Sequence, residues 1–252
     1  MPYLPIREVT AISIVVLLLV SYLWVRAITG GPVRYAGAGR VSKDIIVLTI
    51  AGSFAIVIPA LSLGAFLLEY FEAPPEIIEA LVELIRADGA LELLYAILVT
   101  AIGGSLSEEF VFRGILQNSL SNRLNSWAAL IITSAVFGLL HTVWRLPGAF
   151  LLGMFLGYLY MRTGSLIPSL LAHAVINTTS IVLFNYAESV PAGTLPEWLE
   201  QDKPAPLYLI ALSVVAFSVV IAAVSRRTAR DPYPLQRGYV RVGGPGEAAG
   251  DT

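Results

Sequence analysis

The stretch LELLYAILVTAIGGSLSEEFVFRGILQNSL, residues 91–120, carries Glu108, Glu109 and Arg113 in the middle of a long, mostly apolar run. A charged side chain at the centre of a bilayer helix costs about 2.5–3.5 kcal/mol on insertion scales, so a cluster of three indicates function. Helical spacing places Glu109 and Arg113, four residues apart, on one stripe and turns Glu108 by about 100° from Glu109. We therefore expect Glu109 to pair with Arg113 and Glu108 to point elsewhere.

The composition of the whole chain is that of a membrane protein. Of its 252 residues, 56% are hydrophobic and 13% are charged, and the mean hydropathy is +0.76. We predict an all-α, polytopic transmembrane bundle in the cell membrane. The net charge of −2 argues against a nucleic-acid partner, and the absence of cysteine excludes a thiolate metal site and a cysteine nucleophile.

Hydrophobic runs predict about seven membrane spans, since about 20 apolar residues cross the hydrocarbon core. The predicted spans cover residues 9–27, 44–69, 91–120, 127–143, 147–161, 166–184 and 206–224. In the fifth span, Gly153 and Gly157 form a small-residue stripe that lets another helix approach closely. Residues 76–87 have apolar residues at helical spacing, which fits either a helix on the membrane surface or a solvated acidic connector.

The spans divide the chain into four parts. We expect N-terminal helices with a connector in residues 1–90, a catalytic core in 91–186, an acidic loop and last helix in 187–225, and a disordered tail in 226–252. Positive charge follows the first span, which indicates a retained helix rather than a cleaved signal. With the N-terminus outside, twelve of the 16 Lys and Arg residues lie on the inner side.

The chain has two histidines, each in an apolar segment that also carries another motif residue. His141 ends the pattern Phe137-x-x-x-His141 in the fourth span, and His173 begins His173-x-x-x-Asn177 in the sixth. Glu108 and His141 are each about 16 residues, or about 24 Å, from the predicted hairpin turn near residue 124, so they can face each other. Either histidine taken alone also fits an ordinary buried structural residue.

Together these side chains favour hydrolysis. A partly desolvated carboxylate such as Glu108 can act as general base on water, and His141 can fix the position of that water. His173 and Asn177 lie on one face of their helix and can donate hydrogen bonds to an oxyanion, while Arg113 keeps Glu109 ionised and oriented.

The three motifs, Glu108-Glu109-x-x-x-Arg113, Phe137-x-x-x-His141 and His173-x-x-x-Asn177, resemble in type and order those of the CPBP family. This family comprises CAAX prenyl proteases and bacteriocin-processing intramembrane proteases. The resemblance covers residues 91–184 and implies an intramembrane endopeptidase. In such an enzyme Glu108 and His141 activate water, His173 and Asn177 form the oxyanion hole, and Glu109 and Arg113 support them.

The resemblance leaves the cofactor open between two mechanisms. In one, Glu108, His141 and His173 hold Zn²⁺ with a water in the fourth position. In the other, no metal takes part. We favour the metal-free mechanism, because the i, i+4 pair His173 and Asn177 suits an oxyanion hole and no His-Glu-x-x-His helix is present.

The expected partners are membrane lipid and a peptide or lipidated protein substrate, of CAAX type or resembling a bacteriocin or pheromone peptide. One alternative is a non-catalytic scaffold or immunity protein that binds a peptide at the same site. A proton-coupled transporter ranks last, because the chain shows no internal repeat. The count along the hairpin places the site nearer the outer face, whereas the resemblance to prenyl proteases implies access from the cytosol.

Overall fold

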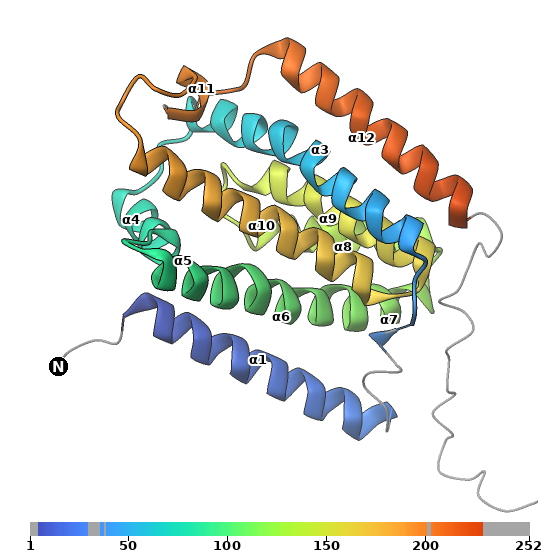
Figure 1. The fold of residues 1–252 in the computed structure, drawn as a ribbon. Coiled ribbons are helices and arrows are strands. Elements are labelled where there is room, and N and C mark those ends of the chain that lie inside the picture. The colour runs from blue at the N-terminus through green and yellow to red at the C-terminus, as the bar shows by residue number, and fades with distance from the viewer. Residues whose placement is uncertain (1–4, 30–35, 38, 201–202, 229–252) are drawn as a thin grey trace, which may run out of the picture.

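The computed structural model describes residues 5–29, 36–37, 39–200 and 203–228, which form helices joined by short turns (Figure 1). In chain order the helices are α1 Ile6–Thr29, α3 Lys43–Leu68, α4 Pro75–Ile85, α5 Ala90–Ala96, η1 Ile97–Gly104, α6 Ser105–Glu109, η2 Phe110–Gln117, α7 Asn118–Ser121, α8 Ser126–Leu139, α9 Leu146–Thr163, α10 Leu166–Ser189, α11 Glu197–Glu200 and α12 Leu207–Thr228. The all-α, multi-pass prediction is confirmed.

Five helical stretches are long and apolar enough to cross a membrane. They are residues 6–27 of α1, all of α3, the continuous helix Ala90–Ser121, α10 and α12. The fourth and fifth predicted spans correspond to α8, a shorter apolar helix of 14 residues, and to α9, which has 18 residues. The chain is therefore a multi-pass membrane protein.

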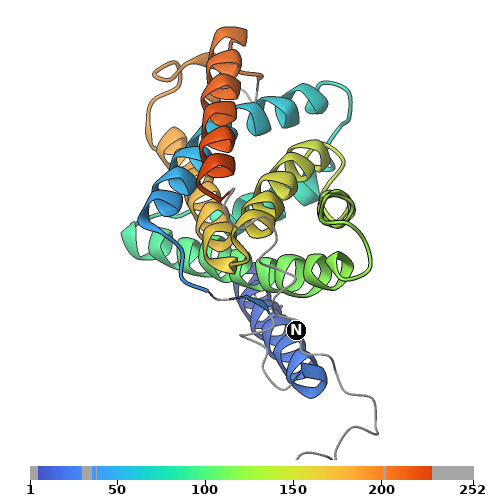
Figure 2. The ribbon, with the colours of Figure 1, turned by 90° about the vertical axis from the view of Figure 1, so that its right-hand side faces the viewer.

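The helices lie side by side, with α1 at one edge of the bundle and α12 at the other (Figures 1 and 2). The largest apolar core joins α3, α9, α10 and α12 through residues such as Ile56, Phe155, Leu156 and Val224. A second core, built from Phe112, Phe137 and Ala149, joins η2, α8 and α9. The helix Ala90–Ser121 packs between α1 and α10, so the charged motif lies inside the bundle.

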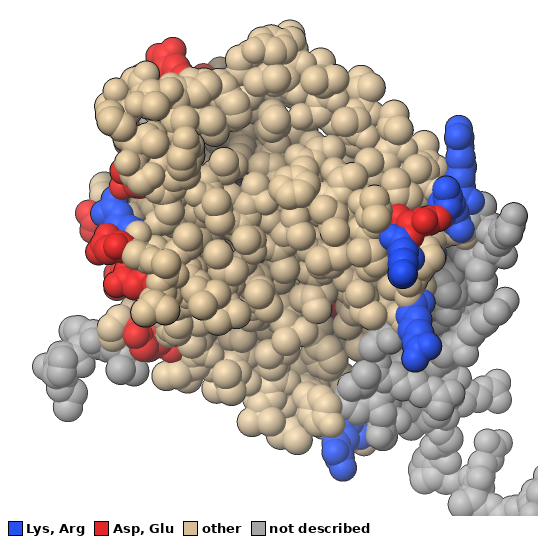
Figure 3. All heavy atoms as spheres, in the orientation of Figure 1, with Lys and Arg blue, Asp and Glu red and all other residues tan. Residues whose placement is uncertain are grey.

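The two ends of the bundle carry opposite charge. Acidic side chains gather at the end where α4 and α5 lie, and most basic side chains gather at the end where α12 finishes (Figure 3). This separation agrees with the predicted orientation, because membrane proteins keep Lys and Arg on the cytoplasmic side. We expect the basic end to face the cytosol.

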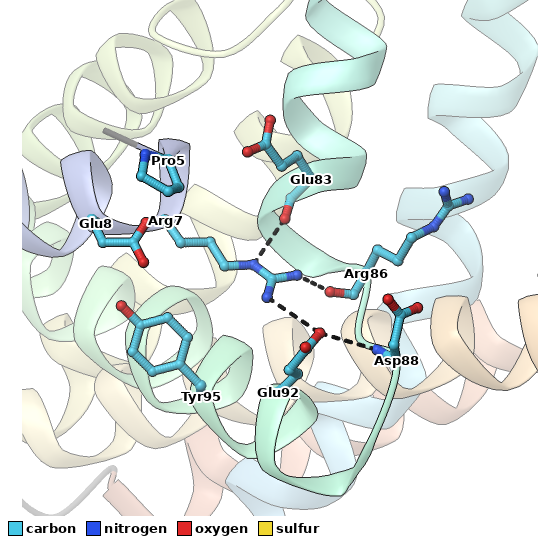
Figure 4. A pocket seen from close by; sticks show the side chains of 8 residues that line it. All are labelled: Pro5, Arg7, Glu8, Glu83, Arg86, Asp88, Glu92 and Tyr95. Carbon is cyan, nitrogen blue, oxygen red and sulfur yellow. Dashed lines mark hydrogen bonds and ion pairs between the residues drawn. The ribbon is translucent and has the colours of Figure 1, made fainter. Parts of the chain in front are cut away.

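The predicted segment 76–87 corresponds to α4, Pro75–Ile85, a helix at the acidic end with no buried residue. Arg7 of α1 donates hydrogen bonds to the carbonyl oxygens of Glu83, at 2.8 Å, and of Arg86, and its Nη1 lies 3.9 Å from Oε2 of Glu92 (Figure 4). These contacts satisfy carbonyl groups at the end of α4, which have no partner within the helix. The pocket of about 420 Å³ that Arg7 lines therefore lies where α1, α4 and α5 meet.

The α9–α10 turn fixes the start of α10 at the basic end. Gly164 adopts φ 63°, a left-handed conformation that ends α9, and the Ser165 hydroxyl accepts a hydrogen bond from the amide of Ile167 to begin α10. The amide of Leu166 donates to the carbonyl of Gly37 at 2.7 Å. This anchoring sets the position of His173, seven residues further along α10.

The predicted division into four parts stays a prediction. Most of the predicted disordered tail, residues 229–252, lies outside the described residues. The described part of that segment, up to Thr228, continues α12.

Candidate active site

The continuous helix Ala90–Ser121, called the central helix below, carries a stripe of buried polar residues that includes Glu109 and Arg113 of the charged motif. Ser105, Glu109, Arg113 and Gln117 follow one another at intervals of four, and each is at most 1% exposed. In a regular α-helix each step of four residues turns the stripe by about 40°, so three steps would carry it well around the helix. The π-helical turns of η2 contain more residues per turn than an α-helix. A step of four residues therefore falls short of a full turn there, which compensates for the rotation in the α-helical part. The mixed α and π geometry therefore keeps all four side chains inside the bundle.

Glu109 and Arg113 form the buried ion pair that their spacing predicts. Nη1 of Arg113 lies 3.2 Å from Oε1 of Glu109, and the side chains are 0% and 1% exposed. Nη2 of Arg113 donates to the carbonyl oxygen of Gly153 at 3.2 Å, and the guanidinium carbon lies 4.8 Å from the centre of the Phe137 ring. Such additional contacts are needed to offset the desolvation of a buried pair.

His173 joins this pair from α10. Its Nδ1 lies 2.9 Å from Oε1 of Glu109, the oxygen that Arg113 also contacts. A carboxylate oxygen only accepts, so Nδ1 carries the hydrogen and donates it to Glu109. The Nε2 atom lies 3.8 Å from Oε2 of Glu108. Glu109 thus orients His173 with its second nitrogen toward Glu108.

The two adjacent glutamates lie in different surroundings. The side chain of Glu109 is 1% exposed and that of Glu108 is 38% exposed. Glu109 is enclosed by cationic and imidazole partners, while water or a substrate can approach Glu108. The structure therefore separates a positioning carboxylate from an accessible one, as the helical spacing suggested.

His141 lies outside the helix in which we expected it. The fourth span was predicted to reach residue 143, but α8 ends at Leu139 and His141 falls in the turn before α9. In this turn the Thr142 carbonyl accepts hydrogen bonds from the amides of Arg145 and Leu146, both at 2.8 Å, just before α9 begins. The position of His141 within a transmembrane helix was a wrong prediction.

The environment of His141 fixes which nitrogen carries its hydrogen. Its Nδ1 lies 2.8 Å from the carbonyl oxygen of Phe137, so Nδ1 donates and the Nε2 of the neutral ring is an acceptor. Within the described part of the chain Glu108 has an ion-pair contact with His173 and none with His141. Glu108 and His141 are therefore not in direct contact, and their predicted sharing of a water molecule stays a prediction.

The Phe137 ring connects the parts of the site. It is fully buried and lies 4.8 Å from the ring of His141, 5.9 Å from that of His173 and 5.0 Å from that of Phe112, measured between ring centres. The sequence motif gives Phe137 no role of its own. The structure shows that both imidazoles and the guanidinium of Arg113 pack against it.

Asn177 lies one helical turn beyond His173 and reaches the central helix. Its Nδ2 donates to the hydroxyl oxygen of Ser105 at 3.3 Å. Gln117, at the other end of the stripe, donates to the carbonyl oxygen of Gly157 at 2.9 Å. We assigned no role to Ser105 or Gln117, although their spacing from Glu109 and Arg113 was a signal that could have pointed to them.

The glycines of α9 allow this close approach. A Cβ atom at Gly157 would lie 2.4 Å from Leu130 Cδ1 and 2.8 Å from Gln117 Oε1. One at Gly153 would lie 3.1 Å from the backbone of Ser134. The predicted packing role of the stripe is confirmed, and its carbonyl groups also hold Arg113 and Gln117.

The zinc alternative at Glu108, His141 and His173 stays a prediction. Among the described residues, no group of three or more His, Cys, Asp or Glu side chains is placed to hold a metal ion. Nδ1 of His141 donates to the Phe137 carbonyl and Nδ1 of His173 donates to Glu109, so in both rings Nε2 is the nitrogen left for a ligand.

The site lies closer to the basic end of the bundle. His173 is seven residues, about 10 Å, from the start of α10 and 16 residues, about 24 Å, from its end. The start of α10 is at the basic end (Figures 1 and 3). This depth favours access from the side that we expect to be cytosolic.

Comparisons with known proteins concern the part of the chain that holds the site. Residues 90–179 match the family model described as "Type II CAAX prenyl endopeptidase Rce1-like". Over 88 residues the chain is 31% identical to a Bacillus subtilis (strain 168) protein named "Putative membrane peptidase YdiL". That match covers 34% of this chain and 36% of the relative. No solved structure matches.

Proposed function

We propose that the chain is an intramembrane endopeptidase, because residues 90–179 match the Rce1-like family model and the chain resembles the protein named "Putative membrane peptidase YdiL". It would hydrolyse a peptide bond in a membrane-associated substrate. The observation that carries the proposal is the contact of His173 with Glu109, because it joins two motifs on separate helices next to the accessible Glu108.

Glu108 is the proposed general base. Its side chain is 38% exposed, so water can reach it. The proposal has His141 Nε2, the free acceptor nitrogen of that ring, hold the same water. Glu108 takes a proton from this water as the oxygen attacks the peptide carbonyl carbon. The protonated Glu108 then gives that proton to the leaving nitrogen as the C–N bond breaks, which produces a carboxylic acid and an amine.

His173 and Asn177 are the proposed oxyanion donors. Asn177 offers N–H groups directly, while His173 can donate from Nε2 only in its imidazolium form, since Nδ1–H already donates to Glu109. Glu109 and Arg113 act as positioning residues that fix the ring of His173. This assignment gives all six predicted residues distinct roles.

The proposed mechanism is metal-free. Every proton transfer above uses a side chain of this chain, so no step requires a metal ion. Activity should survive exhaustive chelation, and elemental analysis of the active protein should find no stoichiometric zinc. Loss of activity on chelation with recovery on added zinc would contradict this part of the proposal.

The substrate class is a further proposal. The family match supports a peptide or lipidated protein that reaches the site within the membrane, such as a CAAX-type prenylated protein or a bacteriocin-like or pheromone-like peptide. The short distance from the site to the basic end favours substrates presented from the cytosolic side.

A proteome comparison tests the function without a known substrate. Cells that carry the wild type, Glu108→Gln or the control Glu72→Gln, which changes an exposed glutamate distant in sequence from the motif, are compared for new protein termini. We expect a set of cleavage products in the wild type and the control that is absent with Glu108→Gln. If Glu108→Gln keeps the biological function and the cleavage products do not differ, the scaffold alternative holds instead.

A further inference from the structure

Ser105 makes a contact that the motifs do not contain. Its side chain is fully buried, and its hydroxyl oxygen accepts a hydrogen bond from Nδ2 of Asn177 at 3.3 Å. The two residues lie on α6 and α10, the helices that also carry Glu109 and His173. The Ser105–Asn177 contact therefore joins the same two helices as the Glu109–His173 contact, one helical turn away from it.

The hydroxyl of Ser105 is used differently from those of two other buried helical serines, Ser53 and Ser134. Ser53 and Ser134 each donate to the carbonyl oxygen four residues earlier in their own helix, at 2.8 and 2.7 Å. The hydrogen bond described for Ser105 comes from another helix. Ser105 directly follows η1, whose π-helical turns shift the carbonyl groups of the preceding turn away from their α-helical positions. The Ser105 hydroxyl oxygen has the lone pairs with which it accepts the hydrogen bond from Asn177.

The chemistry of a carboxamide makes this contact consequential. The amide group of asparagine has two N–H donors on one side and an acceptor oxygen on the other. When one N–H donates to Ser105, the nitrogen side of the group is directed to the central helix, which carries Glu108, and the second N–H is left for a ligand. Without this anchor the carboxamide can rotate and present its oxygen, which repels an oxyanion.

We propose that Ser105 is a positioning residue that fixes the carboxamide of Asn177 as an oxyanion donor. The inference rests on the proposed proteolytic function. It predicts that loss of the Ser105 hydroxyl lowers kcat by about 10- to 100-fold with little change in KM, because a misdirected donor weakens the transition state more than the bound substrate.

The competing explanation is that the contact only holds two helices together. Polar contacts between membrane helices do stabilise packing. Ser62 supplies a matched control, because it is also buried and its hydroxyl accepts a hydrogen bond from another element, the amide of Ala205 at 3.1 Å. Ser62→Ala makes the same chemical change away from the motif residues.

The test is a double-mutant cycle on the purified full chain in proteoliposomes. Initial rates, kcat and KM are measured for the wild type, Ser105→Ala, Asn177→Ala, the double variant and Ser62→Ala. The probes are a fluorophore–quencher peptide with a farnesylated CAAX end, an apolar membrane-spanning peptide, and peptides around any cleavage sites found in the proteome comparison. Thermal midpoints are measured on the same samples.

If Ser105 acts through Asn177, the double variant is no slower than Asn177→Ala, and Ser62→Ala keeps the wild-type kcat even where its thermal midpoint falls. Additive losses of rate, or a wild-type kcat in Ser105→Ala beside a slow Asn177→Ala, would overturn the inference alone. No difference between the wild type and Glu108→Gln on any probe or in cells would overturn the proposed function, and this inference with it.

Discussion

Nδ1 of His173 lies 2.9 Å from Oε1 of Glu109, and this contact joins the third motif of the chain to the first. The same oxygen lies 3.2 Å from Nη1 of Arg113. One buried carboxylate oxygen thus holds both a guanidinium and an imidazole. The orientation of His173 therefore depends on Glu109, and the charge balance of Glu109 depends on Arg113.

Because of this dependence, substitutions in the pair should affect the stability of the fold and the cleavage activity differently. Arg113→Met leaves Glu109 as a buried charge without its partner and should lower the free energy of unfolding by about 3–5 kcal/mol. The double variant Glu109→Met, Arg113→Met buries no charge and should recover much of that stability. It should stay inactive, because His173 has lost its acceptor. Unfolding in mixed micelles and cleavage rates measure the two effects.

The exposed ion pair between Arg86 and Glu188 is the control for this experiment. Its atoms lie 2.6 Å apart, but the side chains are 54% and 50% exposed, so Arg86→Met should change stability by less than about 1 kcal/mol. An active double variant, or an Arg113→Met protein as stable as the control, would contradict the role given to the buried pair.

A second prediction concerns the Phe137 ring. Phe137→Ala should lower the free energy of unfolding by about 3–5 kcal/mol, because the ring is fully buried, and should reduce cleavage further by releasing both imidazoles. Phe54→Ala changes a ring that is 56% exposed and should be nearly neutral. Equal effects of the two substitutions on cleavage by the folded fraction would show that Phe137 does not organise the site.

A third prediction concerns the helix approach at Gly157. In Gly157→Ala the new methyl group would lie 2.4 Å from Leu130 Cδ1, and overpacking of this kind costs about 1–3 kcal/mol. Activity should fall as well, since α9 must move away from Gln117 and Arg113. Gly39→Ala, where nothing lies within 4 Å of the new atom, is the control. A thermal midpoint of Gly157→Ala equal to that of Gly39→Ala would count against this close packing.

Much of the fold followed from hydrophobic periodicity, because the length of an apolar run and the bilayer thickness constrain each other. The predicted pairing of Glu109 with Arg113 also formed, since residues four apart share a helix face over short distances. Both inferences use only local geometry, which a single sequence contains.

The parts that the sequence did not predict depend on contacts between helices. Gln117 continues the four-residue spacing of Glu109 and Arg113, but the apolar pattern does not reveal the π-helical turns of η2 that keep its side chain on the buried stripe. The apolar pattern runs on past Leu139, so it does not reveal that α8 ends there and that His141 lies in a turn. The contact of Glu109 with His173 needs the relative depth of two helices, which a residue count along a hairpin gives only coarsely.

The cleavage rate of Glu108→Gln tests the central claim most directly. The purified variant and the wild type are compared on the same membrane-embedded or prenylated substrate, with thermal midpoints measured in parallel. We predict a folded Glu108→Gln protein whose rate is lower by about 10²–10⁴-fold, the usual contribution of a general base. A folded Glu108→Gln protein that cleaves at the wild-type rate would contradict the account.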